Sequence, residues 1–114
     1  MGQSDVWQPG VAIVTGASAG LGRAYSVELG RAGTAVTLVA RRAVELEETA
    51  RLVRGAGGRC EVVVGDVTER GLAEDVVAQT EATLGPVDML VANAGLLGLG
   101  SLALIQHEFR AALR

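Results

Sequence analysis

The glycines between positions 15 and 22 form the first segment whose residue types suit a chemical role. The segment reads Thr-Gly-Ala-Ser-Ala-Gly-Leu-Gly and connects the apolar run 11–14 to a segment of helical periodicity. Because the backbone N–H groups at a helix N-terminus are free and the helix dipole is positive there, this position suits a pyrophosphate group. Gly16 would permit a tight turn, Gly20 would let a phosphate approach the backbone, and Gly22 would let helix and strand pack closely. The simpler alternative is a glycine-rich connection that binds no ligand.

Two adjacent arginines follow the second apolar run, 35–40, in the sequence Ala40-Arg41-Arg42. Dinucleotide-binding proteins that select NAD(H) place an acidic residue near the end of the second strand, where it binds the ribose 2′-hydroxyl. Here Ala40 stands at that position, and an arginine can pair with a 2′-phosphate through several N–H groups and stack on adenine. Arg41 and Arg42 therefore favour NADP(H) over NAD(H). The alternative is that both are solvated residues before a helix.

Other reactive side chains are few in this chain. It contains one cysteine, Cys60, and one histidine, His107, so it can form neither an intramolecular disulfide nor a metal centre built from cysteines or histidines. All ten cationic residues are arginines. A P-loop is excluded because that motif requires a lysine. We assign no catalytic residue and no metal ligand.

Apolar runs alternate with segments of helical periodicity along the chain. Strands are predicted at 11–14, 35–40, 60–64 and 89–92, and helices at 21–31, 44–54 and 69–84. The first helix is expected to bury one apolar face, made of Leu21, Ala24, Val27 or Leu29, and Ala32. Apolar strands joined by helices predict an α/β fold with a doubly wound parallel sheet of the Rossmann type, incomplete at about four strands, with helices on both faces. We expect a tail at 1–9, a dinucleotide-binding βαβαβαβ unit at 10–95, and a loop with the start of a truncated helix at 96–114.

Composition and charge exclude several classes of protein. The chain has 114 residues, 49% of them hydrophobic and 20% charged, with a net charge of −3, which fits a folded domain or part of one. It has no overall basic field to bind nucleic acid or anionic membrane. The uncharged stretch 89–106 contains Asn93, Ser101 and Gln106, which favours a buried strand and a glycine-rich loop over a membrane span. Without an export signal and with a single cysteine, the chain is expected in the cytoplasm.

Three motifs together resemble the short-chain dehydrogenase/reductase family. They are Thr-Gly-x-x-x-Gly-x-Gly at 15–22, Asp66-Val67 after the third predicted strand, and Asn93-Ala94-Gly95 after the fourth. With the order of elements, the resemblance covers roughly residues 10–95. It implies a nicotinamide dinucleotide as cofactor and, in the intact protein, hydride transfer between that cofactor and an alcohol or carbonyl substrate.

The resemblance also implies roles for residues in the first motif. Ser18, Gly20 and Leu21 would line the phosphates, and Leu21 would contribute its backbone N–H.

In the other two motifs, Asp66 would accept a hydrogen bond from the adenine amino group, and the Val67 backbone would contact the ring edge. Asn93 and Gly95 would border the adenosine ribose. Asp66 has an alternative role as an anion at a helix start, although Thr68 looks the better cap. Asn93 has an alternative role as a structural amide that ties neighbouring strands.

The sequence lacks the residues on which catalysis depends in that family. These residues are a serine, a Tyr-x-x-x-Lys pair and a helix asparagine. Tyr25 is the one tyrosine, Leu29 stands four residues after it, and the chain has no lysine. Ser101 does not match the family serine. We therefore expect these 114 residues alone to be inactive.

Two hypotheses follow for the chain as a whole. In the favoured one it is the cofactor-binding part of an oxidoreductase, since Arg114 falls within a predicted helix. In the other it is a complete short module that binds a nucleotide or a partner without catalysis. The nucleotide sequence beyond codon 114 separates them. In the family the strand at 89–92 is an interior strand; here it is expected to be a sheet edge open to self-association.

Overall fold

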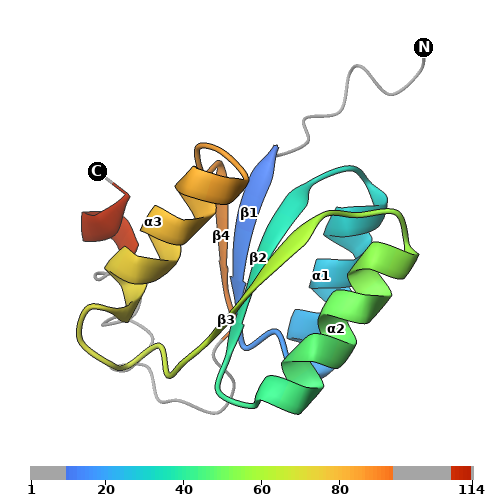
Figure 1. Cartoon of the computed structure of the whole chain (residues 1–114), viewed down its shortest axis with the longest axis horizontal. Coiled ribbons are helices and arrows are strands. Elements are labelled where there is room, and N and C mark those ends of the chain that lie inside the picture. The colour runs from blue at the N-terminus through green and yellow to red at the C-terminus, as the bar shows by residue number, and fades with distance from the viewer. Residues whose placement is uncertain (1–9, 94–108, 114) are drawn as a thin grey trace.

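The structure, a computed structural model, describes residues 10–93 and 109–113. Strands and helices alternate in the order β1 (Val11–Thr15), α1 (Gly20–Arg31), β2 (Ala35–Ala40), α2 (Ala43–Gly55), β3 (Cys60–Val64), α3 (Leu72–Thr83) and β4 (Met89–Ala92) (Figure 1). A helical turn at 109–112 follows. The strands form one parallel sheet in the order β3-β2-β1-β4. The prediction of a four-stranded Rossmann-type sheet is confirmed.

The two central strands are buried along their whole length. Every residue of β1 and of β2 is buried, whereas β3 and β4, the outer strands of the described sheet, are mostly half-buried. In the register, Ile13 of β1 lies between Thr37 of β2 and Leu90 of β4. This burial explains why β1 and β2 read as continuous apolar runs in the sequence.

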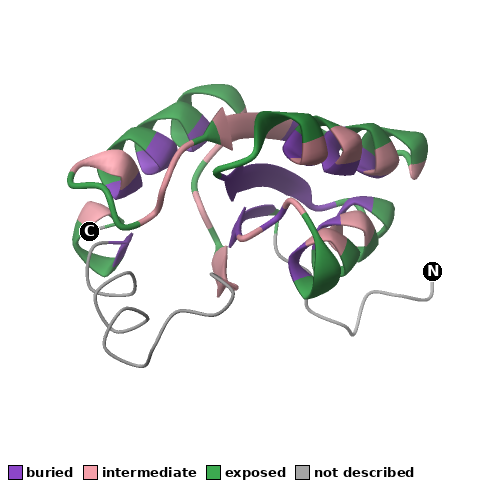
Figure 2. Ribbon diagram, turned by 90° about the horizontal axis from the view of Figure 1, so that it is seen from below, coloured by how far each residue is buried: buried purple, intermediate pink, exposed green. Residues whose placement is uncertain are grey.

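Helices cover both faces of the sheet (Figures 1 and 2). On one face α1 and α2 pack over a cluster that includes Val14, Leu38, Leu46 and Val53. On the other face α3 and the turn at 109–112 enclose a second cluster, which includes Ile13, Val39, Val76 and Phe109. Phe109 is completely buried, so the last described segment belongs to the core.

The prediction for the buried face of α1 was wrong in part. Val27 and Leu29 are half-buried and pack against the first cluster. Leu21 is 64% exposed and Ala24 is also exposed, while Gly22, Ser26 and Gly30 are buried. These three small residues lie four apart on one face of the helix, which lets the α1 backbone approach its neighbours closely. A Cβ atom at Gly30 would lie 2.7 Å from Cγ1 of Val53 in α2.

Helix α3 begins three residues later than predicted, at Leu72 instead of Glu69. Gly71 precedes it with φ 86°, a left-handed conformation that interrupts a right-handed helix. Residues 65–71 form bends and turns instead. The other helix ends differ from prediction by one residue at most. Within the described segments, no helix combines the length and hydropathy needed to cross a bilayer.

Candidate functional site

All four strands run in the same direction, so the segments that follow them meet at one end of the sheet, the lower end in Figure 1. From β1 the chain crosses to β2 on one side, and β4 pairs with β1 on the other. In open α/β sheets, this reversal of strand order is where ligands bind. The glycine turn after β1 lies at that point.

The glycine turn presents a helix N-terminus without a cap. Gly16 and Gly20 have φ values of 64° and 56°, a region that glycine enters without strain. Ala19 is the N-cap of α1, makes no side-chain capping hydrogen bond, and is followed by no acidic residue in the first turn. The first backbone N–H groups of α1 therefore have no capping side chain, and they lie at the positive end of the helix dipole, where an external anion can bind.

Gly22 and Gly20 differ in the space around them. A Cβ atom at Gly22 would lie 2.1 Å from the carbonyl oxygen of Gly16 and 2.8 Å from Nδ2 of Asn93. At Gly20 a Cβ atom would meet nothing within 4 Å. Gly22 thus permits the close packing of helix, turn and Asn93, while Gly20 borders open space.

Asn93 joins the end of β4 to the end of β1. Its backbone N–H donates to Oγ1 of Thr15 at 3.0 Å, and the Thr15 hydroxyl lies 3.4 Å from the carbonyl oxygen of Val91. The Asn93 side chain lies next to the glycine turn, as its distance to Gly22 shows. Ala94 and Gly95, the other two residues of that motif, lie outside the described residues.

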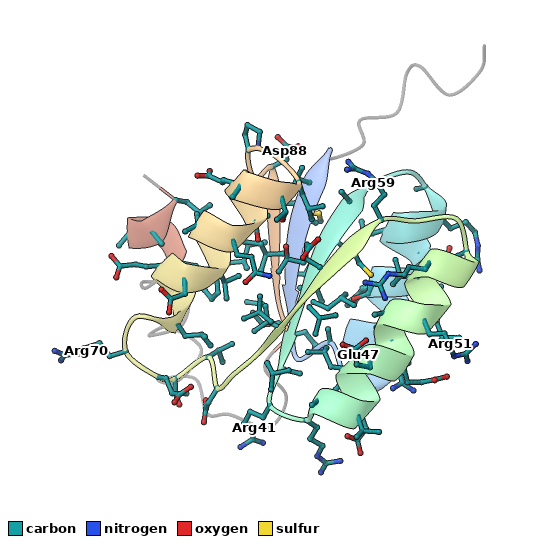
Figure 3. All side chains as sticks on the ribbon, in the orientation of Figure 1. Arg41, Glu47, Arg51, Arg59, Arg70 and Asp88 are labelled. Carbon is teal, nitrogen blue, oxygen red and sulfur yellow. The ribbon has the colours of Figure 1, made fainter. Side chains whose placement is uncertain are left out.

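The two arginines after β2 are exposed, whereas Ala40 before them is 7% exposed. Arg42 is the N-cap of α2 and forms a weak ion pair with Glu45 at 3.8 Å. Arg41 extends from the lower end of the sheet toward solvent (Figure 3) and, in the described part of the chain, forms no ion pair. Its guanidinium group is therefore available to a ligand.

Asp66 follows β3 and has partners for one carboxylate oxygen. Oδ1 accepts hydrogen bonds from the Thr68 hydroxyl at 2.6 Å and from the Thr68 backbone N–H at 2.9 Å. These two bonds, with a smaller attraction from Arg41, lower the pKa of the Asp66 carboxyl. Asp66 therefore accepts from Thr68 in a turn that precedes α3, and Thr68 does not cap the helix. The side chain of Val67 packs against the core cluster beneath α3.

Sequence reasoning missed two residues behind the glycine turn. Arg23 of α1 and Thr49 of α2 form hydrogen bonds with the carbonyl oxygens of Ser18 and Ala17. Neither residue belongs to a recognisable motif. The signal in the sequence is weak, because Thr49 is one polar residue on a helix and Arg23 reads as an ordinary charged residue.

The comparisons with known proteins agree with this fold. A model described as short chain dehydrogenase matches residues 10–111. A short chain dehydrogenase of Pseudocercospora fijiensis is 42% identical over 91 residues, which are 80% of this chain and 29% of that protein.

Two solved structures share the architecture. The L-sorbose reductase of Gluconobacter frateurii, solved with NADPH and L-sorbose, has a TM-score of 0.80 at 27% identity and covers 93% of this chain and 46% of its own. A xylitol dehydrogenase solved with NAD⁺ has a TM-score of 0.81 at 25% identity, over 90% of this chain and 46% of its own. The chain spans less than half the length of these relatives. Because the family model covers most of its residues, the chain belongs to the short-chain dehydrogenase family.

Proposed function

We propose that this chain is the NADP(H)-binding part of an oxidoreductase of the short-chain dehydrogenase type. The observation that carries the proposal is the uncapped N-terminus of α1 at the switch point of the sheet, with the exposed Arg41, which forms no ion pair among the described residues, at the same end of the sheet. The intact protein would transfer a hydride between the cofactor and an alcohol or carbonyl substrate.

The residues at the site fit such a cofactor. The N–H groups of the turn, including those near Ser18 and Leu21, would hold the pyrophosphate.

Asp66 has Oδ2 free of the Thr68 hydrogen bonds and stays ionised at neutral pH, so it can accept a hydrogen bond from the adenine amino group. The Val67 backbone would contact the ring edge. Asn93, with Ala94 and Gly95 after it, would border the ribose.

The preference for a 2′-phosphate rests on the end of β2. Solved relatives include one with NADPH and one with NAD⁺, so membership of the family leaves the choice open. At Ala40 no carboxylate repels a 2′-phosphate, and Arg41, with Arg42 next to it, offers N–H donors to one. Hydrogen bonds to charged groups contribute about 1.5–3 kcal/mol, so NADP(H) should bind roughly tenfold to a hundredfold more tightly than NAD(H).

Isothermal titration calorimetry with NADPH and NADH tests this proposal. Arg41→Ala should lower the affinity for NADPH and leave the affinity for NADH nearly unchanged. Arg59→Ala is the matched control, because Arg59 lies at the opposite end of the sheet (Figure 3). Equal affinities of the unchanged chain for both cofactors would refute the preference, and no binding of either would refute the proposal.

Catalysis would need residues that these 114 positions do not contain. Tyr25 lies on α1, and the sequence has no lysine to pair with it. We therefore propose that residues 1–114 bind the cofactor without catalytic turnover. The alternative, a short non-catalytic module that binds a nucleotide or a partner, would also show no turnover. Cofactor-dependent turnover by the purified chain, lost on Gly22→Ala, would exclude both possibilities. A cytoplasmic location remains part of the proposal.

A further inference from the structure

Arg23 donates hydrogen bonds to three acceptors, one in the glycine turn and two in α2. Its Nη2 donates to the carbonyl oxygen of Ser18 in the glycine turn at 2.7 Å and to that of Glu45 in α2 at 2.9 Å. Its Nε donates to Oγ1 of Thr49 at 2.9 Å. Since Arg23 itself belongs to α1, this half-buried side chain connects the turn to both helices of that face.

Thr49 continues the connection from the other side. Its hydroxyl is fully buried, accepts from Arg23 and donates to the carbonyl oxygen of Ala17 at 2.8 Å. The backbone N–H of Ala17 in turn donates to the carbonyl oxygen of Val39 in β2 at 3.1 Å. The carbonyl groups of Ala17 and Ser18 thus accept hydrogen bonds from side chains of α2 and α1, respectively.

This network spans the distance between the two parts of the candidate site. Helices α1 and α2 begin at the same end of the sheet (Figure 1), and α2 begins directly after Arg41 and Arg42. Glu45, which accepts from Arg23, lies in the first turn of α2 and forms an ion pair with Arg42. The position of the phosphate turn relative to the arginines therefore depends on Arg23.

We propose that Arg23, with Thr49, is a positioning residue that holds the glycine turn at a fixed place against α2. It keeps the pyrophosphate-binding N–H groups and the 2′-phosphate-binding arginines at the separation that a single dinucleotide needs. This inference rests on the proposed function for its effect on cofactor binding. The hydrogen-bond network itself does not depend on a ligand.

The test compares a ligand that spans both parts of the site with one that does not. NADP⁺ reaches the turn and Arg41, whereas 2′-AMP reaches only the adenosine end. Arg23→Met should weaken NADP⁺ binding about tenfold and 2′-AMP binding by less than about twofold, because preorganisation matters most to the spanning ligand. Arg31→Met is the matched control on the same helix, since the interaction of Arg31 within residues 10–93 and 109–113 is an exposed ion pair with Glu28.

Variants of Thr49 separate a positioning role from a merely structural one. Thr49→Ser keeps the hydroxyl and should bind NADP⁺ as the unchanged chain does, whereas Thr49→Val should reproduce the loss seen in Arg23→Met. The double variant of Arg23→Met and Thr49→Val should be scarcely weaker than either single variant, because both act on one network. Additive losses would contradict the proposal.

A ligand-free measurement keeps this inference distinct from the proposed function. In hydrogen exchange followed by NMR, Arg23→Met should accelerate exchange of the Ala17 N–H relative to Arg31→Met, while the Val36 N–H in the central sheet stays protected. Unchanged exchange at Ala17, or equal losses for NADP⁺ and 2′-AMP, would overturn the inference. If the unchanged chain bound neither ligand, the proposed function would fall, and faster exchange at Ala17 would still support the network.

Discussion

The carboxylate of Asp66 is held in its ionised form mainly by one neighbouring residue, Thr68. The Thr68 hydroxyl and backbone N–H both donate to Oδ1, and they are the main causes of the lowered pKa. The pKa of Asp66 is therefore lower in the folded chain than in the unfolded chain, and the Thr68 hydrogen bonds stabilise the folded state at pH values above the unfolded pKa. This stabilisation is lost as the pH falls through the folded value.

We expect Thr68→Val to raise the pKa of Asp66 toward its ordinary value, as measured by NMR titration of the side-chain carboxyl carbon. Loss of the hydroxyl removes the largest cause of the shift, while the backbone N–H remains. Thr83→Val is a suitable control, because the Thr83 hydroxyl donates to the carbonyl oxygen of Gln79 and touches no carboxylate. An Asp66 pKa that does not move in Thr68→Val would contradict this account.

Among the glycines of the described residues, Gly22 leaves the least room for a Cβ atom. Gly22→Ala would force a methyl group against the backbone of Gly16, so we expect a loss of about 2 kcal/mol or more in the free energy of unfolding. Gly55→Ala, also in a helix but with open space around it, should be neutral or stabilising by up to about 1 kcal/mol. Urea denaturation of both variants measures the difference, and similar stabilities would show that the turn relaxes easily.

At the scale of elements, a pair of buried hydroxyl groups joins β2 to α3. The Thr80 hydroxyl donates to the carbonyl oxygen of Val76 at 2.7 Å, so the Thr37 hydroxyl, 2.7 Å away, is the donor to Thr80. Both side chains are fully buried. The two threonines are therefore unequal partners, since Thr80 keeps a hydrogen bond without Thr37 but Thr37 has none without Thr80.

This asymmetry predicts different costs for two similar substitutions. Thr80→Val leaves a buried donor unsatisfied and should lower the free energy of unfolding by about 1–3 kcal/mol. Thr37→Val should cost less than about 1 kcal/mol, because no donor loses its acceptor. Thermal or urea unfolding of the two variants measures both costs, and a larger loss in Thr37→Val would reverse the assignment of donor and acceptor.

The elements themselves could be predicted from the sequence far better than the contacts between them. Alternating apolar runs and helical periods located the four strands and three helices from β1 to β4. Burial on both faces of β1 and β2 leaves a continuous apolar signal in the sequence. The buried face of α1 could be predicted only in part, because the pattern located Val27 and Leu29 but not the buried small residues. The close approach of α1 to the glycine turn and to α2 selects small residues at Gly22 and Gly30, and Leu21, the most apolar residue of its first turn, is exposed.

The candidate site was predictable to the extent that its residues lie in local motifs. The glycine turn, Arg41 and Asp66 each follow a strand, and parallel pairing brings strand ends together. Arg23 and Thr49 lie 26 positions apart on two helices, and only the packing of α1 on α2 brings them together. The start of α3 was missed because the left-handed conformation of Gly71 depends on the turn before it.

At the scale of the whole molecule, β4 is the outer strand next to β1 in the described sheet. Its four residues are half-buried and none of them is charged, so the strand lacks the features that prevent edge-to-edge pairing. Leu90 packs against the cluster under α3, and Val91 packs against the cluster under α1 and α2. Met89 belongs to neither cluster.

We therefore expect the chain to self-associate through β4 in a concentration-dependent way, as measured by light scattering coupled to gel filtration. Met89→Lys should shift the chain toward monomer, because a lysine on an edge strand opposes pairing and little core packing is lost. Val44→Lys makes the same change of charge on α2, where Val44 is 80% exposed, and should leave the association unchanged. If the unchanged chain is a monodisperse monomer at all concentrations and unfolds cooperatively without cofactor, the β4 edge is not an association surface.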